Sequence, residues 1–504
     1  MINKIAFGTG GVRGIMGDGE GFINHQTIKK VTHGLAKVIL SSDAPKRVGV
    51  AHDTRFNSKE FAQTVCEVMS AFCIDVYFFD KPMPTPVLSH AIQIMDLGWG
   101  VCITASHNPQ EYNGYKVYDR YGVQVTDRIA AEITGSINSI DINGTIPEKQ
   151  NEYINKFDEK ITEAYFEQII SFVQPEKEQS EYPFIYSALH GAGANAVPTV
   201  LKRLKFSPIC IQQNPDGAFG GLKTPNPEEP VVYEKALAEA EKVNAMFLLA
   251  TDPDCDRVGV MVKTEKGFEP VNGNQIGALL IDYIAQTRGI SKGDTVISTI
   301  VSGLLGEHVA KGYGLEFERL LTGFKYIGER ITNLPQDRKF FFGYEESYGF
   351  LAGDGARDKD AVIASALIIK MAEHYSKKGM TLIDRLSELS KKYGYCLESL
   401  YSANVPQDIQ RKIMNKIRSG ISIDGVTKIT DYDRGVDSLP QADVVKLLFE
   451  SNGEINCINA WAAIRPSGTE PKLKIYTGVH TKTYEDAKAA LEILTENIIA
   501  ELGV

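Results

Sequence analysis

The sequence predicts an α/β protein built from several domains. Its 504 residues exceed the roughly 100 to 200 residues of a typical domain, so we expect three or four. With 43% hydrophobic and 23% charged residues, the chain can bury a large core. Short apolar runs of strand character alternate along it with longer stretches of helical periodicity, and this alternation is typical of α/β folds.

Four of the predicted strands deliver polar loops that contain glycine or proline. In order, 98–103 (GWGVCI) precedes 104–109 (TASHNP), 245–250 (AMFLLA) precedes 251–257 (TDPDCDR), 339–342 (KFFF) precedes 343–349 (GYEESYG), and 459–464 (NAWAAI) precedes 465–471 (RPSGTEP). Helices are expected between them, over residues 58–71, 272–286 and 360–374. Ligands bind beyond the carboxyl ends of parallel strands, so the four loops either meet at one cleft or are unrelated surface turns.

Pauses in the element pattern suggest where the domains begin and end. The charged, turn-rich stretch 141–152, the turn at 263–267 and the stretch 377–381 each interrupt the alternation. We therefore expect four domains, and their predicted ranges are 1–150, 151–266, 267–385 and 386–504.

Charge and cysteine content limit the partners and the compartment. The chain has 54 basic and 64 acidic residues, a net charge of −10, which argues against a general nucleic-acid binder. Its seven cysteines are odd in number and form no C-x-x-C pair, so we expect reduced thiols in a cytoplasm. The amino terminus has no apolar signal segment, and the longest apolar stretch, 361–371, is too short to span a bilayer. We expect a soluble protein with no membrane partner.

Asp252, Asp254 and Asp256 alternate along the second of these loops and form a candidate metal site. In an extended turn their carboxylates can point to one side and offer hard oxygen ligands to Mg²⁺ or Ca²⁺. A calcium-binding EF-hand is excluded, because its sixth position would be Arg257 rather than glycine and its twelfth Lys263 rather than glutamate. Three negative ligands leave room for water and a phosphate oxygen, the usual arrangement for Mg²⁺.

Ser106 follows the first of these strands and is a candidate nucleophile or phosphate carrier. A polar turn or a helix cap is the alternative for such a serine. His107 is adjacent, and Lys116 lies close enough in sequence to return to the same cleft as an acid, a base or a phosphate ligand. Near the amino terminus, Arg13 stands in a glycine-rich segment that could approach phosphate oxygens.

The remaining two loops suggest binding of phosphate and of sugar hydroxyls. Residues 465–472 combine an arginine fork, two hydroxyls and a glycine, which favours phosphate over a plain turn. Glu345 and Ser347 are hydrogen-bond acceptors between glycines, which suits sugar hydroxyls, although an ordinary charged turn is equally compatible. The chain has no Gly-Lys dipeptide, no G-x-S-x-G and no H-E-x-x-H, so Walker A, serine hydrolase elbow and zinc-protease motifs are absent from the sequence.

Taken together and in order, five motifs resemble the signature loops of the α-D-phosphohexomutase family, which includes phosphoglucomutases and phosphomannomutases. The motifs are residues 8–14 (GTGGVRG), 104–109, 252–257, 343–349 and 465–471, and they span nearly the whole chain. The stretches 223–230 (KTPNPEEP) and 322–329 (TGFKYIGE) resemble the phosphoglucomutase branch, which also contains phosphopentomutases. The resemblance implies three related mixed-sheet α/β domains and a carboxyl-terminal α+β domain of the TATA-binding-protein-like type around a central cleft.

The resemblance also implies a role for each matching residue. Ser106 would be the phosphoserine, and one of its phosphate oxygens would join Asp252, Asp254 and Asp256 around one Mg²⁺. Glu345 and Ser347 would hold sugar hydroxyls. The phosphate that is not being transferred would be bound by four residues of the last loop, Arg465, Ser467, Gly468 and Thr469.

The chain departs from its relatives at two places. Pro253 stands where many relatives have glycine, which stiffens the metal loop but keeps all three carboxylates. Residues 323–325 read Gly-Phe-Lys where dual-specificity enzymes tend to have Gly-His, which favours glucose over mannose.

The sequence thus predicts a mutase, an isomerase that interconverts glucose 1-phosphate and glucose 6-phosphate with Mg²⁺ and glucose 1,6-bisphosphate. Lys116 is the first candidate for general acid and base, and His107 is the second. Arg13 and Arg257 would stabilise the transferring phosphoryl group, and Lys325 would help to select the substrate. The alternatives are a phosphomannomutase or phosphopentomutase, a metal-dependent sugar phosphatase and a non-catalytic sugar-phosphate sensor. We expect the protein to be a monomer or homodimer.

Overall fold

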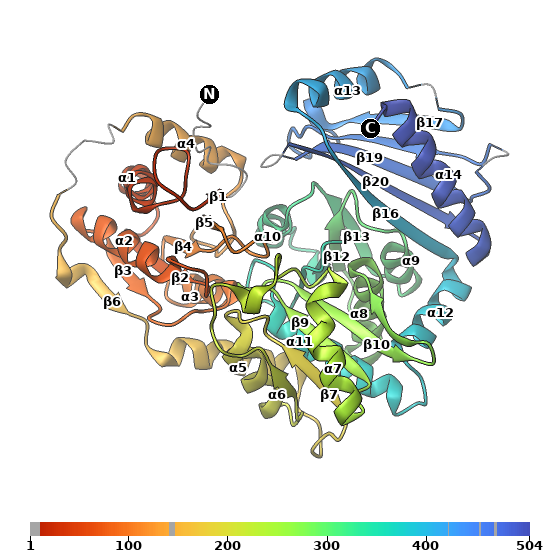
Figure 1. Cartoon of the computed structure of the whole chain (residues 1–504), viewed down its shortest axis with the longest axis horizontal. Helices are drawn as coiled ribbons and strands as arrows, with labels where there is room; N and C mark the ends of the chain where they lie inside the picture. The colour runs from red at the N-terminus through yellow and green to blue at the C-terminus, as the bar shows by residue number, and fades with distance from the viewer. Residues whose placement is uncertain (1–10, 141–146, 422, 453–454, 468–470) are drawn as a thin grey trace. The chain divides into compact units, whose positions relative to one another are not determined.

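The computed structural model describes residues 11–140, 147–421, 423–452, 455–467 and 471–504 (Figure 1). Contacts divide the chain into two compact units. Unit 1 is Met1–Gly273 with Gly323–Gly379, and unit 2 is Asn274–Thr322 with Met380–Val504. The division does not test the four predicted domain ranges, which remain predictions.

The first sheet of unit 1 is mixed and has the strand order β1-β5-β4-β2-β3-β6. Its strands are β1 (Gly11–Ile15), β2 (Arg47–His52), β3 (Asp75–Phe78), β4 (Trp99–Ile103), β5 (Tyr112–Tyr118) and β6 (Ile154–Lys156). Strands β4, β2, β3 and β6 run parallel, whereas β5 and β1 complete the sheet in antiparallel pairs. The accompanying helices are α1 (His25–Ser41), α2 (Ser58–Ala71), α3 (Thr85–Ile94) and α4 (Asp127–Asn138). Apolar faces of α1 and α2 share one core with the strands, so the carboxyl end of β4 is held firmly.

The second sheet of unit 1 has the order β11-β10-β9-β7-β8. Its strands are β7 (Phe184–Ser187), β8 (Ile209–Ile211), β9 (Phe247–Thr251), β10 (Val258–Thr264) and β11 (Gly267–Val271). The helices of this region are α5 (Glu159–Val173), α6 (Gly193–Arg203) and α7 (Glu234–Val243), and the 3₁₀ turns are η1 (Asn151–Tyr153), η2 (Phe219–Gly221) and η3 (Pro230–Tyr233). Strand β9 is buried along its whole length, because it lies between β7 and β10 in the interior of the sheet.

Unit 1 is completed by residues 323–379. They form α10 (Phe324–Thr332), the antiparallel pair β14 (Lys339–Tyr344) and β15 (Phe350–Ala352), and α11 (Ala361–Ser376). Helix α11 is apolar on nearly every side and packs against α5, α6 and β15. The β14–β15 turn is joined to the start of β10, because the Val258 amide donates to the Tyr348 carbonyl at 3.1 Å.

Unit 2 contains a parallel pair of strands and a larger antiparallel sheet. The pair is β12 (Asp294–Thr299) and β13 (Glu316–Leu320), with α8 (Gly273–Arg288), α9 (Leu305–Gly312) and α12 (Leu382–Tyr393). The sheet has the order β16-β20-β19-β18-β17, with β16 (Tyr395–Asn404), β17 (Val426–Asp431), β18 (Val445–Phe449), β19 (Asn459–Pro466) and β20 (Lys472–Thr481). Helices α13 (Gln407–Ser419) and α14 (Tyr484–Leu502) share its apolar core, and η4 (Tyr432–Arg434) follows β17 (Figure 1).

These elements confirm the predicted α/β class and the predicted strands and helices. The four predicted strands are β4, β9, β14 and β19, and the three predicted helices are α2, α8 and α11. The chain ends in a sheet-based α+β region, as expected. Within the described residues, no helix is both long and apolar enough to cross a bilayer.

Candidate active site

The loop after β9 gathers three buried carboxylates. Asp252, Asp254 and Asp256 each offer an oxygen within 4.8 Å of the others. The turn is held by Asp252, whose Oδ1 accepts from the amides of Asp256 and Arg257, both at 3.0 Å. Cys255 stands at φ +55°, a left-handed backbone that brings Asp254 and Asp256 to the same side. Local hydrogen bonds therefore build the three-carboxylate arrangement that the alternation of aspartates predicted.

This carboxylate cluster fits a divalent cation. Asp254 Oδ1 and Asp256 Oδ1 are buried and have no hydrogen-bond partner among the described residues. Burial and the two neighbouring carboxylates raise the pKa of Asp252 well above its usual value. Buried oxygens without partners are costly unless a cation binds them, and hard oxygen ligands of this kind suit Mg²⁺.

Ser106 lies directly beside this cluster. Its Oγ donates to Asp252 Oδ2 at 2.8 Å, across 146 positions of sequence. The Ser106 backbone is left-handed, with φ +52°, and its amide donates to Thr104 Oγ1 at 2.8 Å. Such strained backbone at a non-glycine residue persists only where the surroundings hold it, and it is common at functional sites.

Arg55 holds the serine loop in place, and the sequence reasoning missed it. Its guanidinium donates to the carbonyls of Asn108 at 2.6 Å, Pro109 at 2.8 Å and Tyr112 at 3.1 Å, and also to the Ser106 carbonyl. The Asp53 carboxylate forms an ion pair with Arg55, with Oδ2 and Nε 3.2 Å apart, and both side chains are fully buried. Residues 53–55 (DTR) follow β2, so the pattern of a strand that ends in a polar loop could have identified this loop as well.

Lys116 is the second cation of the site. Its Nζ lies 2.7 Å from Asp254 Oδ2 and 2.9 Å from Asp256 Oδ2. Burial alone would lower the pKa of Lys116, but the two carboxylates outweigh it and hold that pKa well above its usual value. In this arrangement Lys116 is an ammonium group that carries its proton.

Two more polar groups flank the carboxylates. His107 Nδ1 lies 3.2 Å from Ser106 Oγ, and burial together with Arg257 and Arg13 lowers the pKa of His107 well below its usual value. Lys359, which the sequence reasoning also missed, lies 3.1 Å from Asp256 and 3.0 Å from Asp358. A neutral imidazole and two ammonium groups therefore surround Ser106 and the aspartates.

The remaining predicted residues of unit 1 lie at the edges of this cluster. Arg13 Nη1 donates to Asn108 Oδ1 at 2.9 Å, which joins β1 to the serine loop. Arg257 Nη1 pairs with Glu228 at 2.9 Å and its Nε lies 3.9 Å from Asp256. An isolated bridge joins Arg257 to Gly349 at the end of the β14–β15 turn.

Glu345 and Lys325 are both buried and already have partners. The Gly323 amide donates to Glu345 Oε1 at 2.9 Å, and Glu345 stands with Ser347 on the β14–β15 turn. Burial raises the pKa of Glu345, although Lys359 and Arg257 oppose this. Lys325 Nζ pairs with Asp127 at 2.7 Å, so its carboxylate partner competes with any ligand for this ammonium.

The predicted phosphate loop belongs to unit 2. Arg465 is on β19 and Ser467 follows it, with the Ser467 amide donating to the Lys472 carbonyl at 2.7 Å. Gly468 and Thr469 lie outside the described residues. The proposed roles of all four stay predictions.

Three family models match the chain along most of its length. They are described as phosphoglucomutase/phosphomannomutase alpha/beta/alpha domains I, II and III, and they match residues 4–143, 163–267 and 272–393. The chain is 34% identical to the phosphoglucomutase of Staphylococcus haemolyticus, over 96% of this chain and 91% of that protein. It is 35% identical to the phosphoglucomutase of Staphylococcus epidermidis, over 95% of this chain and 91% of that protein.

The chain belongs to the phosphoglucomutase/phosphomannomutase family. It is a phosphohexomutase, and mutases of this family are isomerases. The crystal structure of a putative phosphomannomutase from Thermus thermophilus has the same fold, with a TM-score of 0.74 and 24% identity over 98% of this chain and 99% of that one. The family implies a metal cofactor, and the three aspartates of this phosphohexomutase fit one.

Proposed function

We propose that this phosphohexomutase interconverts glucose 1-phosphate and glucose 6-phosphate through a phosphoserine at position 106. The observation that carries the proposal is the contact of Ser106 Oγ with Asp252, beside carboxylate oxygens that have no hydrogen-bond partner within the described chain. Relatives more than 30% identical over nearly the whole chain are phosphoglucomutases, which supports glucose as the sugar.

Asp252, Asp254 and Asp256, with an oxygen of phosphorylated Ser106, would hold one Mg²⁺ ion. When bound, this ion neutralises negative charge on the phosphoryl group that is transferred. Lys116 and Lys359 supply further positive charge at Asp254 and Asp256. The net charge of the chain is negative, so this local collection of cations is what attracts a doubly phosphorylated sugar.

The first step transfers the phosphoryl group from Ser106 to the sugar. The O6 hydroxyl oxygen of glucose 1-phosphate attacks phosphorus, the bond between phosphorus and Ser106 Oγ breaks, and glucose 1,6-bisphosphate forms. One proton leaves O6 and one is gained by Oγ, so the proton count is unchanged.

The second step returns a phosphoryl group to Ser106. The bisphosphate turns round within the site, Ser106 Oγ attacks the phosphorus at position 1, and the sugar O1 leaves with the proton that Oγ loses. Glucose 6-phosphate is released and the phosphoserine is restored. Exclusion of water during this turn protects the phosphoserine from hydrolysis.

Lys116 and His107 are the two candidates for proton transfer, and their ionisation states differ. Lys116 holds its proton between two carboxylates, so it is placed to act as the acid. His107 is neutral, and its Nδ1, which lies 3.2 Å from Ser106 Oγ, can accept a proton in the tautomer that leaves Nδ1 unprotonated. Arg13 and Arg257 would stabilise the transferring group.

Substrate contacts would come from two loops and one helix. Glu345 and Ser347 would bind sugar hydroxyls, and Lys325 would help to select the sugar once a ligand competes with Asp127. Arg465, Ser467, Gly468 and Thr469 would bind whichever phosphate is not being transferred. Location in a cytoplasm, a monomeric or homodimeric state and the absence of nucleic-acid or membrane partners remain proposals.

A coupled assay tests the proposed substrate. Purified protein with Mg²⁺ and catalytic glucose 1,6-bisphosphate is given glucose 1-phosphate, mannose 1-phosphate and ribose 1-phosphate in parallel, and kcat/KM is measured for each. We expect a clear preference for glucose 1-phosphate. Preference for mannose or ribose would keep the mechanism and overturn the sugar, whereas steady phosphate release without isomerisation would identify a phosphatase.

A further inference from the structure

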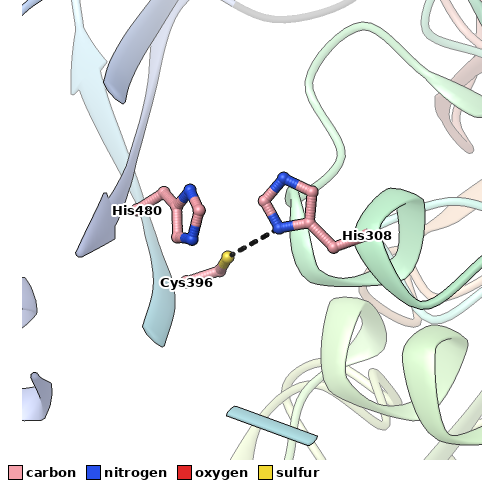
Figure 2. Close-up of side chains that lie close together, drawn as sticks. All are labelled: His308, Cys396 and His480. Carbon is pink, nitrogen blue, oxygen red and sulfur yellow. Dashed lines mark hydrogen bonds between the residues drawn. The ribbon is translucent and has the colours of Figure 1, made fainter. Parts of the chain in front are cut away.

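Three side chains of metal-ligating type converge in unit 2, apart from the residues assigned to catalysis. His308 is on α9, whereas Cys396 and His480 are directly opposed partners on the antiparallel strands β16 and β20. One nitrogen of each imidazole and the Cys396 sulfur all lie within 4.8 Å of one another. Figure 2 shows the three side chains pointing toward one another from these three elements.

The spacing within the cluster is close to that of a tetrahedral metal site. His308 Nδ1 lies 3.8 Å from Cys396 Sγ, and the two imidazole ring centres are 4.5 Å apart. A zinc ion bonded at about 2.0 Å to nitrogen and about 2.3 Å to sulfur holds those two atoms about 3.5 Å apart at a tetrahedral angle. The contact between His308 Nδ1 and Cys396 Sγ therefore has to shorten by only a few tenths of an ångström for coordination.

His480 is buried, with 8% of the residue exposed, and one of its ring nitrogens is already bonded. Its Nε2 lies 3.0 Å from the Tyr393 carbonyl. Its Nδ1 is buried and has no hydrogen-bond partner among the described residues. A backbone carbonyl that fixes one ring nitrogen is the usual outer partner of a metal-binding histidine.

The hydrogen bonds of His480 decide which of its ring nitrogens can coordinate. A backbone carbonyl only accepts hydrogen bonds, so Nε2 carries the proton and Nδ1 carries the lone pair that a metal requires. An ordinary thiol–imidazole contact is the alternative, but a single sulfur–nitrogen contact of 3.8 Å leaves His480 Nδ1 without a partner.

We propose that His308, Cys396 and His480 bind one Zn²⁺ ion, with a water molecule in the fourth position. Two imidazoles and a thiolate are borderline to soft ligands, which favour zinc over the magnesium that carboxylates prefer. On binding, the Cys396 S–H bond breaks, a sulfur–zinc bond forms and the proton passes to solvent. The ion would join α9 to the β16–β20 pair, two segments of unit 2 that are far apart in sequence.

The first test measures zinc binding by the full-length protein after chelator treatment and dialysis. Excess Mg²⁺ is kept present so that the aspartate cluster is saturated, and zinc affinity is determined by competition with a chromophoric chelator. We expect one Zn²⁺ per chain. His308→Gln, Cys396→Ser and His480→Gln should each weaken binding about tenfold or more, whereas Cys457→Ser, a partly buried cysteine of the same unit, should not.

The second test uses Co²⁺ to show that sulfur is a ligand. Wild type and Cys457→Ser should give a sulfur-to-cobalt charge-transfer band, and Cys396→Ser should not. Zinc should also raise the melting temperature of wild type but not of His308→Gln, a substitution at a partly buried position of α9. The proposal is overturned if zinc is not bound in excess Mg²⁺, or if the cobalt band persists in Cys396→Ser.

Discussion

Ser106 depends on groups that do not touch substrate. Its left-handed backbone is held by Arg55, which donates to the carbonyls of Ser106, Asn108 and Pro109. The Asp53 carboxylate in turn holds Arg55, and burial raises the pKa of Asp53 although the guanidinium opposes this. Arg55 is thus a positioning residue for the proposed phosphate carrier.

Arg55→Lys should destabilise the folded protein and slow its catalytic turnover. An ammonium group cannot reach all of these carbonyls, and each buried acceptor left without a donor costs about 1–3 kcal/mol. We expect the free energy of unfolding to fall by roughly 3 kcal/mol and kcat to fall at least about tenfold, because Ser106 moves. Urea unfolding and the coupled assay measure the two effects.

Arg47→Lys is the matched control for Arg55→Lys. Arg47 is partly exposed and pairs with Asp96 at 3.5 Å, so its substitution should change stability by no more than about 1 kcal/mol and leave kcat intact. Equal effects of the two substitutions would rule out the positioning role of Arg55.

Lys446 should make the stability of the folded protein depend on pH. Burial and Arg319 lower the pKa of Lys446 to about 7, while its Nζ donates to the Ile300 carbonyl at 2.6 Å. Between pH 7 and 10.5 the unfolded chain binds more protons at this lysine than the folded one, so this group makes the fold more stable as pH rises.

Lys446→Met should remove that dependence. Between pH 7 and 9 the stability of wild type should rise by up to about 2 kcal/mol more than that of the variant, since one pKa unit corresponds to about 1.4 kcal/mol. Denaturant unfolding at several pH values measures the difference. Lys428→Met, at an exposed position of the same sheet, should follow wild type. Parallel curves for wild type and Lys446→Met would contradict the lowered pKa.

Sequence reasoning identified the chemistry of individual residues better than their pairing. Alternation of acidic residues was enough to predict the aspartate cluster, since the carboxylates are close together in sequence. The pairing of Lys116 with Asp254 joins two sheets across 138 positions, and nothing local indicates it. The pairing of Lys325 with Asp127 joins residues 198 positions apart and is likewise not indicated locally, and the contact of Lys325 with substrate stays a prediction.

At the scale of elements, close contact between β5 and its neighbours positions the serine loop. Gly114 pairs with Arg13 of β1, and a Cβ added at Gly114 would lie 2.5 Å from the Thr104 carbonyl oxygen and 2.8 Å from that of Val12. Both of those atoms are backbone and cannot turn away. Only glycine therefore lets β5 approach both β1 and the segment that leads to Ser106.

Gly114→Ala should destabilise the protein by about 1–3 kcal/mol, because β5 must move away from its neighbours. The mutase rate should fall with it, since Lys116 is on the same strand. Gly135→Ala is the control, because a Cβ at that position of α4 meets no described atom within 4 Å. That substitution should stabilise the protein by up to about 1 kcal/mol. Thermal unfolding of both variants distinguishes steric exclusion from a general effect of replacing glycine.

The elements themselves were largely predictable. The runs 99–103 and 247–251 are buried throughout and end where their polar loops begin, so apolar content and loop chemistry were sufficient to find β4 and β9. Strand order was not predictable, because β1 joins the first sheet next to β5, about a hundred residues later. The His308, Cys396 and His480 cluster was also missed, since only the β16–β20 register brings its two strand residues together.

At the scale of the whole molecule, the proposed metal should couple binding to stability. A ligand that binds only the folded chain stabilises it by about 2.7 kcal/mol at a hundred times its dissociation constant. We expect Mg²⁺ to raise the melting temperature of wild type and chelation to reverse the change. Asp256→Asn should lose most of the response, and Asp96→Asn, an exposed aspartate of the same unit, should keep it. The same response in wild type and Asp256→Asn would exclude the aspartate cluster as the site.

Labelling of the protein with glucose 1,6-bisphosphate tests whether Ser106 carries a phosphoryl group. Wild type, Ser106→Ala and the exposed control Ser139→Ala are incubated with glucose 1,6-bisphosphate and Mg²⁺, and phosphopeptides are located by mass spectrometry. We predict one phosphoryl group on Ser106 in wild type and in Ser139→Ala, and loss of both the label and bisphosphate-dependent turnover in Ser106→Ala. Full turnover by Ser106→Ala, or a phosphoryl group on another residue, would show that Ser106 is not the phosphate carrier.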